Sequence, residues 1–268
     1  ASAAAKGRRT GEDFEVVLLE AGPYISFANC GLPYYVGGEI AERDALFVVR
    51  PEQFAKRFGI DVRVQCRATA VDPKARTITV AGPSGDCEEL SYDRLVLATG
   101  TVGVVPPIDG LRRPNIFSLR TVPDADAVQD FLARASGKEA DAVAAAARAE
   151  TPVEAVVIGG GYIGLEAAEQ LHRRGVRVTV IEMMPQLMPG ALDAEMAEPL
   201  REALAASGVE VLVGDGVARI EDRDGRSAAV TRSGRVVPFD VGILAVGARP
   251  NVALAAHAIY QYAVEIPA

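Results

Sequence analysis

The segment from Val153 to Glu182 constrains the fold of this chain more than any other part of the sequence. It begins with an apolar stretch, VEAVVI, passes through a glycine-rich turn into a helical stretch, GLEAAEQLHRRG, and ends with a second apolar stretch, VRVTVI. Short apolar runs bounded by turn residues predict strands, and the stretch between them has helical spacing. The order predicts one βαβ unit and therefore an α/β fold.

The glycines of this turn, Gly159, Gly161 and Gly164, have the GxGxxG spacing of a dinucleotide-binding turn. The first allows a tight bend, the second lets a pyrophosphate approach the backbone, and the third lets the helix pack on the strand. The phosphate then lies at the helix N-terminus. Glu182 ends the second strand, where its carboxylate can bind a ribose 2′-hydroxyl and repel a 2′-phosphate, which favours NADH over NADPH. An ordinary glycine-rich βα turn is the alternative.

A second copy of this plan lies at the start of the chain. Residues 1–23 repeat the order of residues 164–185: an alanine-rich helix, a double arginine, an apolar strand, a terminal glutamate and a proline close behind it. Such internal repetition predicts two units built alike. Glu20 takes the place of Glu182 as a ribose-binding acid, or is a surface glutamate after a strand. The alignment places the partner of Gly164 just before the first residue, so we expect the first strand and turn of this unit to be cut off.

Each half of the chain continues with short β-rich stretches separated by turn signals, and then with a strand that ends in a glycine. The ends of these strands are ATG at Ala98–Gly100 and AVG at 245–247. Residues 121–152 are rich in alanine and acidic residues and predict a helix followed by a solvated connector. We expect Cys66 in a strand and Cys87 in a turn.

Charge and composition exclude several classes of function. The formal net charge of −8 repels a phosphate backbone, which argues against nucleic acid as a partner. The sequence has no apolar run of about eighteen residues and no signal peptide at its start, so we expect a cytoplasmic protein with no membrane partner. Three cysteines without CxxC spacing and two histidines predict neither a disulfide framework nor a metal site.

Residues 26–38 read SFANCGLPYYVGG and follow the strand that ends in Glu20. A proline three residues after Cys30 is typical of a first helical turn, which would place the thiol where its nucleophilic thiolate form is stabilised. An isolated cysteine is more often a small buried hydrophobic residue. In this context, however, the motif resembles the single-cysteine branch of the pyridine nucleotide–disulfide oxidoreductases, and within it the coenzyme A-disulfide reductases and NADH-dependent persulfide or polysulfide reductases.

The resemblance also includes ATG, LRTVPDADAV, GGGYIGLE and GARPN, so it covers nearly the whole chain. It implies two Rossmann-like dinucleotide-binding domains, each with a small antiparallel β-meander. Residues 1–120 and 245–268 would form an FAD-binding domain, and residues 121–244 an NAD-binding domain. The reaction that it implies is the reduction of coenzyme A disulfide, or of a persulfide or polysulfide, by NAD(P)H through FAD and one redox-active cysteine.

On the substrate side, the resemblance makes Cys30 the nucleophile that attacks a disulfide or persulfide sulfur and holds a mixed disulfide with the thiol product. It implies contacts of Ser26 and Asn29 with the thiol substrate. It also implies that Lys6 and Arg9 hold the phosphates of coenzyme A, although a solvated helix face explains these two residues equally well.

On the cofactor side, the resemblance makes Tyr162 an aromatic gate that covers the flavin until NADH enters, with plain helix packing as the alternative. Glu166 would lie near the nicotinamide amide, and Glu20 would bind the adenosine ribose of FAD. The cofactor-binding positions as a whole are Glu20, Ala68, Ala98, Thr99, Gly100, Gly159, Gly161, Tyr162, Ile163, Gly164, Glu166, Glu182 and Gly247.

The sequence departs from the family at both ends. We expect the 17 residues after Asn251 to be too few for the second flavin motif, and we expect the C-terminal domain through which the family forms homodimers to be missing. We therefore expect a fragment or truncated product with an incomplete FAD domain. Two alternatives stay open: an NADH oxidase or peroxidase in which Cys30 cycles through a sulfenic acid, and a non-catalytic nucleotide-binding fragment.

We expect the nicotinamide half, roughly residues 121–244, to keep its fold while FAD occupancy is weak or nil, because a doubly wound sheet that lacks a strand has unpaired edges and less buried area. A visible spectrum of the purified chain, together with titration calorimetry of NADH, tests this. NADH binding without a flavin band is the expected result and would favour the non-catalytic alternative. A stoichiometric flavin band contradicts the expectation.

Overall fold

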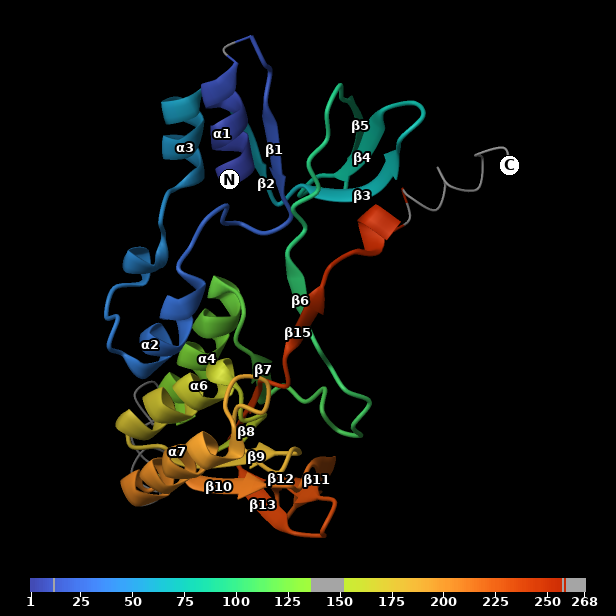
Figure 1. The fold of residues 1–268 in the computed structure, drawn as a ribbon. Coiled ribbons are helices and arrows are strands. Elements are labelled where there is room, and N and C mark those ends of the chain that lie inside the picture. The colour runs from blue at the N-terminus through green and yellow to red at the C-terminus, as the bar shows by residue number, and fades with distance from the viewer. Residues whose placement is uncertain (12, 136–151, 257, 259–268) are drawn as a thin grey trace. The chain divides into compact units, whose positions relative to one another are not determined.

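The expected βαβ unit forms as β8 (Glu154–Ile158), α6 (Tyr162–Arg173) and β9 (Arg177–Glu182). The two strands pair in parallel along β8. The prediction of this unit from the sequence is therefore confirmed. The computed structural model describes residues 1–11, 13–135, 152–256 and 258, whose fold is drawn in Figure 1.

Contacts within the chain divide it into two units. The first comprises residues 1–28, 47–102 and the segment from Arg249 onward, and the second comprises residues 29–46 and 103–248. The cysteine segment, residues 29–46, therefore belongs by its contacts to the same unit as the glycine-rich turn. The boundaries predicted from the sequence divide the chain by the nucleotide that each part binds, FAD or NAD. A division by contacts does not test them, so they stay a prediction.

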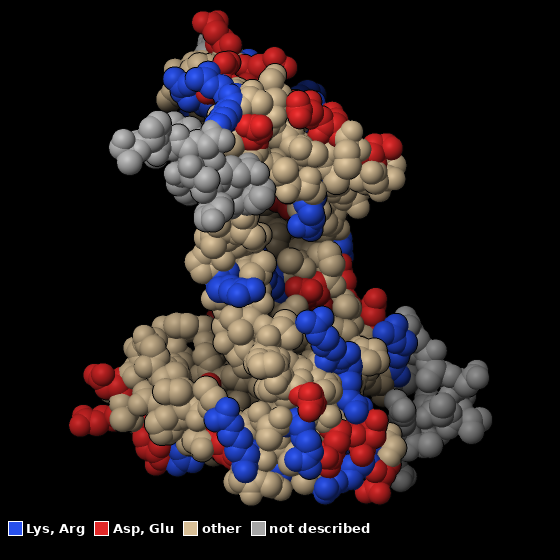
Figure 2. Space-filling model, turned by 90° about the vertical axis from the view of Figure 1, so that its right-hand side faces the viewer, with Lys and Arg blue, Asp and Glu red and all other residues tan. Residues whose placement is uncertain are grey.

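Acidic and basic side chains lie among one another over the face that Figure 2 shows, without a continuous basic stripe. This mixed distribution accords with the net charge of −8 of the whole chain. Among the helices that the structure describes, none is both long enough and apolar enough to cross a membrane.

The second unit is built on a parallel sheet of five strands in the order β10, β9, β8, β14, β7. Helix α6 packs on β8 and β9. The strands of a parallel sheet carry apolar side chains on both faces, so other elements have to cover both faces. The strands and helices not yet named are β7 (Ile116–Ser118), α4 (Val122–Ala135), α7 (Ala194–Ser207), β10 (Glu210–Val213) and β14 (Val241–Leu244).

Helix α4 confirms the helix expected within residues 121–152. Thr121 and Asp124 cap its start reciprocally: the backbone N–H of Asp124 donates to the Thr121 hydroxyl, and that of Thr121 donates to the Asp124 carboxylate. The connector expected after this helix falls, for residues 136–151, outside the described part of the chain.

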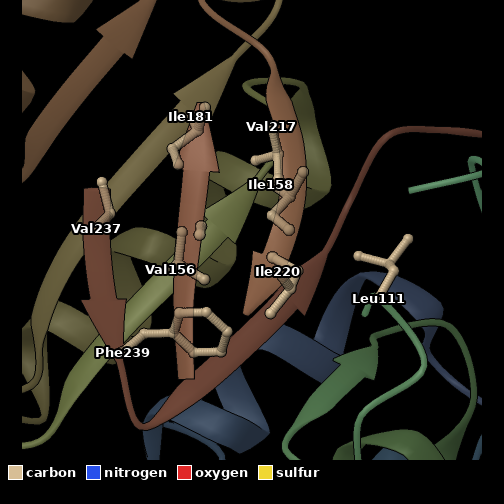
Figure 3. Packing of buried hydrophobic residues seen from close by; sticks show 9 residues of the cluster. Leu111, Val156, Ile158, Ile181, Val217, Ile220, Val237 and Phe239 are labelled. Atoms are coloured by element: carbon tan, nitrogen blue, oxygen red, sulfur yellow. The ribbon is translucent and has the colours of Figure 1, made fainter. Parts of the chain in front are cut away.

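An antiparallel meander covers the sheet and closes the core of the second unit. It consists of β11 (Val217–Arg223), β12 (Arg226–Thr231) and β13 (Val236–Phe239). Val156, Ile158 and Ile181 of the sheet pack against apolar side chains of the meander, as Figure 3 shows. Because successive side chains of a strand point to opposite faces of the sheet, every second residue of a strand points toward the meander. The meander residues in the cluster are Val217, Ile220, Ala229, Val237 and Phe239.

The first unit repeats part of the plan. Helix α1 (Ser2–Thr10) precedes β1 (Val17–Glu20), as the internal repeat predicts, and β1 pairs in parallel with β2 (Asp61–Val64). An antiparallel meander of β3, β4 and β5 follows. Ala5, Phe54 and Ile60 form a small core between the helices and strands. The remaining bounds are α3 (Pro51–Phe58), β3 (Arg67–Asp72), β4 (Thr77–Ala81) and β5 (Cys87–Ser91).

The strand expected before Ala98–Gly100 does not form, so this prediction is wrong. Residues 92–100 are irregular, and Val96 is 69% exposed. The reason lies in strand pairing. In the second unit the corresponding strand, β14, pairs with β8 on one side and β7 on the other. Among its described residues, the first unit has no strand in the position of β8, and an unpaired strand leaves its backbone groups without partners.

The placements expected for two cysteines are also wrong. Gln65 has a positive φ of 55° and ends β2, so Cys66 lies in the connection to β3, where its N–H donates to the carbonyl of Glu20 at 2.9 Å. Cys87 is not in a turn, because it begins β5 and pairs with Ala81. The first correction comes from the backbone turn at Gln65, and the second comes from pairing with β4, which a local pattern does not record.

Replacing Phe239 by alanine should lower the free energy of unfolding by about 3–5 kcal/mol, because the ring is 1% exposed and its loss leaves a cavity beside the sheet. Phe14→Ala is the matched control. That ring is 58% exposed, so its loss should cost only about 0.5 kcal/mol. Urea unfolding followed by circular dichroism measures both, and equal losses would contradict this placement of the core.

Candidate functional site

The glycine-rich turn between β8 and α6 is tight for two measurable reasons. Gly159 has a φ of 112°, and a Cβ at this position would lie 2.4 Å from the carbonyl oxygen of Ala245. A Cβ at Gly164 would lie 2.0 Å from the carbonyl oxygen of Gly159. Real Cβ atoms do not approach oxygen so closely, and only glycine tolerates such a φ without strain. The turn therefore needs glycine at both positions, and this lets α6 pack on the sheet.

Gly161 differs from the other two glycines because it borders open space. A Cβ there would have no described atom within 4 Å, and no side-chain hydrogen bond caps the first turn of α6. The N–H groups at this end of the helix are therefore available to an anion. Tyr162 and Ile163 begin the helix and are 66% and 45% exposed. The exposure of Tyr162 argues against plain helix packing, and its role as a gate stays a prediction.

Glu182 closes the turn from the end of β9. It is 9% exposed, and its two carboxylate oxygens accept hydrogen bonds from the backbone N–H groups of Gly160 and Met184, each at 2.7 Å. A carboxylate has about four acceptor sites, so Glu182 keeps capacity for ribose hydroxyls. Open space at Gly161, a helix N-terminus and this acid together fit the dinucleotide NADH.

The first unit repeats the geometry of this acid. The carboxylate of Glu20 accepts a hydrogen bond from the N–H of Gly22 at 2.7 Å, as that of Glu182 does from Met184. In both units another strand pairs in parallel with the strand that ends in the acid. The two residues that follow this other strand donate backbone N–H groups to the carbonyl of the acid and to the carbonyl of the residue two positions after it. The described residues of the first unit include no counterpart of the glycine turn, so the set of residues that could hold FAD is a partial one.

The other positions expected at FAD lie as follows. Ala68 packs against the core of the first meander, so its side chain is partly buried. Thr99 and Gly100 are exposed and are held by Asn251, whose N–H donates to the carbonyl of Gly100 at 2.9 Å and whose carbonyl accepts from the hydroxyl of Thr99. Gly247 borders open space. Ala98 is also exposed.

Cys30 begins the structure that its motif predicts. It lies in a 3₁₀ turn, η1 (Asn29–Gly31), that leads directly into α2 (Leu32–Gly37), with Pro33 in the first turn of the helix. Its side chain is exposed, so the structure contradicts the alternative of a small buried hydrophobic residue. Because α2 packs on α6, the thiol lies on the helix pair whose other member starts at the nucleotide turn.

Several acidic side chains act through their charge on the hydroxyl of Tyr34, which lies one helical turn after Cys30. The charge of Glu166 is the largest cause that raises the pKa of Tyr34, followed by burial and by Glu169, Glu39 and Cys30. Tyr34 therefore stays a neutral phenol and a hydrogen-bond donor at physiological pH. The acid expected near the nicotinamide amide and the expected nucleophile thus both act through their charge on the hydroxyl of Tyr34, within the second unit.

The residues expected to bind substrate belong to both units. Lys6 and Arg9 are exposed three residues apart on α1, and so on one face of the helix. Arg8, between them, has a structural role because its guanidinium donates to the carbonyls of Phe58 and Phe14 at 3.1 and 2.9 Å. Ser26 is half-buried in the first unit, whereas Asn29 is exposed in the second unit beside Cys30.

Sequence reasoning missed the residues that hold α2. Gln129 of α4 and Gln170 and Arg174 of the α6 region contact α2 or the residues that follow it. The double arginine was the only signal for any of them, and it served merely to align the internal repeat. Glutamine and arginine on a helix are ordinarily surface residues, so no local pattern could have singled them out.

Comparisons with known proteins agree on the family. The family described as "Pyridine nucleotide-disulphide oxidoreductase" matches residues 1–266. An NADH oxidase of Methanocaldococcus jannaschii is 31% identical over 97% of the chain and 55% of its own length. The NAD(P)H sulfur oxidoreductase (CoA-dependent) of Pyrococcus abyssi is 32% identical over 95% of the chain and 52% of its own length.

The crystal structure of reduced Bacillus anthracis CoADR-RHD superposes with a TM-score of 0.86 at 39% identity, over 96% of this chain and 43% of its own. The chain spans about half the length of the curated relatives described above.

Gly161→Ala and Gly164→Ala should separate nucleotide binding from folding. The methyl at 161 fills the space for the pyrophosphate, so the Kd of NADH should rise about tenfold or more with little change in stability. The methyl at 164 meets the backbone of the turn, so unfolding should become easier by about 1–3 kcal/mol. Titration calorimetry and urea unfolding measure the two effects. A Gly161→Ala variant as unstable as Gly164→Ala would contradict the assignment.

Proposed function

Because this chain belongs to the pyridine nucleotide-disulphide oxidoreductases, we propose that its residues serve the reduction of a disulfide or persulfide by NADH, with FAD as cofactor. One observation carries this proposal: the exposed Cys30 lies in the turn that leads into α2, α2 packs on α6, and α6 begins at the glycine turn. A thiol and a nucleotide turn on one pair of helices suit a redox reaction better than either does alone.

NADH binds at the turn of Gly159 and Gly161 in this proposal, with its pyrophosphate at the N-terminus of α6 and its adenosine ribose at Glu182. The carboxylate of Glu182 repels a 2′-phosphate and so disfavours NADPH. Tyr162 acts as the gate over the flavin, and Glu166 contacts the nicotinamide amide. Gly164 and Ile163 complete the turn.

FAD, when bound, supplies the relay that passes the two electrons of a hydride from NADH to sulfur. The residues that would hold it are a subset of those that the family uses: Glu20 at the adenosine ribose, and the backbone of the exposed loop at Ala98–Gly100. Two further positions complete this set, Ala68 and Gly247.

The thiolate of Cys30 attacks one sulfur of a disulfide R–S–S–R, forms a Cys30–S–S–R bond, and releases the other half as a thiolate that takes a proton. Reduction by two electrons, with one proton, then releases the second thiol and restores the Cys30 thiolate. The overall balance is NADH, one proton and one disulfide giving NAD⁺ and two thiols. Cys30 is the only residue that this chemistry requires to change its bonding.

The substrate that we propose is a small thiol compound, coenzyme A disulfide or a persulfide of related structure. Lys6 and Arg9 present two positive charges on one helix face, which suits the phosphates of coenzyme A. Ser26 and Asn29 contact the thiol end. We further propose that the protein is cytoplasmic. The family assembles as homodimers through a C-terminal domain.

An NADH oxidase or peroxidase is the second candidate, in which Cys30 is oxidised by peroxide to a sulfenic acid and reduced again. The name of the relative from Methanocaldococcus jannaschii favours it. The exposed, single cysteine of η1 suits either reaction, so the discrimination has to come from the chemistry of the thiol itself.

Incubation with coenzyme A disulfide should add one coenzyme A to the chain as a mixed disulfide, which intact-mass spectrometry measures without any need for flavin. Cys30→Ser should abolish this adduct because it removes the nucleophile. Cys66→Ser and Cys87→Ser are matched controls and should keep it, since both remove a thiol outside the motif.

The same experiment with dilute hydrogen peroxide, trapped by a sulfenic acid reagent, decides between the candidates. Faster modification of Cys30 by coenzyme A disulfide supports disulfide reduction, and faster modification by peroxide overturns it in favour of the second candidate.

A further inference from the structure

Helix α2, which follows Cys30, is short and is held mainly from outside. It has six residues, and such a helix is marginal unless tertiary contacts stabilise it. At its C-terminal end the carbonyls have no partner further along the helix. The backbone N–H of Gly38 donates to the carbonyl of Tyr35. The carbonyl of Tyr34 accepts from the N–H groups of Glu39 and Ile40. Other helices supply the remaining partners.

Two side chains from α4 and the end of α6 reach these carbonyls. Gln129 donates through Nε2 to the carbonyl of Tyr35 at 2.5 Å, and Arg174 donates through Nη1 to the carbonyl of Val36 at 2.7 Å. Arg174 also donates to Oε1 of Gln129 at 2.6 Å. The amide of Gln129 therefore uses both ends, and the two side chains form one connected clamp on α2.

The chemistry of Arg174 makes this contact unusual. Burial lowers the pKa of Arg174, and the partners described above are a carbonyl and an amide, neither of which carries a charge. Keeping a guanidinium partly out of water without a carboxylate costs free energy. A surface arginine would avoid that cost, and its neighbour Arg173 does so, because it remains exposed and pairs with Glu39 and Glu169.

Gly37 of α2 and Gln170 of α6 are in close contact at the same interface. Gln170 is 1% exposed, and a Cβ at Gly37 would lie 1.9 Å from its Oε1. Gln170 also donates to Glu39 at 3.2 Å, just beyond the end of α2. The C-terminal end of α2 is thus fixed on α6 by close contact and by the clamp, whereas the N-terminal end carries the exposed thiol.

We propose that Arg174 and Gln129 are positioning residues, which hold α2 on α6 and thereby set the place of the Cys30 thiol relative to the helix that begins at the nucleotide turn. The inference rests on the proposed function in so far as Cys30 is the reacting group. Neither residue touches the substrate or a cofactor: each acts through the backbone of α2.

Hydrogen exchange and thiol reactivity test the proposal on a Cys66→Ser, Cys87→Ser background, in which Cys30 is the only thiol. Arg174→Ala should raise amide exchange in the peptide that spans residues 32–40 about tenfold, the factor for loss of one hydrogen bond from a charged donor. The rate at which Cys30 reacts with an aromatic disulfide reagent should shift with it. The Kd of NADH and exchange in β8 should stay within about twofold, a change below 0.5 kcal/mol.

Matched variants keep the proposal falsifiable. Arg173→Ala removes the exposed neighbour and should change none of these quantities, because exposed ion pairs contribute little. Arg174→Lys should restore part of the protection, since lysine keeps a positively charged donor group but not the planar fork of the guanidinium. Gln129→Ala should reproduce the selective effect from the other side of the clamp.

Several outcomes would overturn it. The proposal fails if Arg174→Ala and Gln129→Ala leave exchange and thiol reactivity unchanged. It also fails if both variants lose NADH affinity together with overall stability, as a general structural defect would cause. These readouts involve no disulfide turnover. A selective effect here together with unaltered adduct formation in Cys30→Ser would refute the proposed function while leaving the clamp on α2 established.

Discussion

Helix α6 can lie against both its own sheet and α2 because glycine stands at both points of contact. A Cβ at Gly164 would lie 2.0 Å from the backbone oxygen of Gly159, and one at Gly37 would lie 1.9 Å from Oε1 of Gln170. A methyl at Gly164 meets backbone and forces the helix from the turn, whereas one at Gly37 displaces the buried side chain of Gln170. Through these two contacts a single rigid helix joins the nucleotide turn at its N-terminus to the cysteine segment along its side.

The terminal acids of β1 and β9 show how one local solution serves two units. Glu20 and Glu182 each accept a hydrogen bond from the backbone N–H two residues later, which fixes the chain as it leaves the strand. Glu182 alone also accepts from Gly160. That additional bond ties the acid to the glycine turn, which has no counterpart among the described residues of the first unit.

Local pattern was sufficient where neighbours in sequence are neighbours in space. The βαβ unit around Gly164 follows from hydrophobic period and turn glycines, and the helix after Cys30 follows from a proline in its first turn. Local pattern failed at the strand before Ala98, because an apolar run becomes a strand only when another strand pairs with it. It failed for Cys66 because the positive φ of Gln65 ends β2 just before it.

The sequence by itself determined the α/β class, the positions of the turn glycines and their terminal acid, and the motif around Cys30, since each of these depends on residues close together in the chain. Only the tertiary structure decided that the cysteine segment packs on α6, and that Arg174 and Gln129 bind its carbonyls. Those contacts join residues 94 and 138 positions apart. Which surface side chain becomes a buried donor is settled by how the helices pack, and no period or spacing in the chain encodes it.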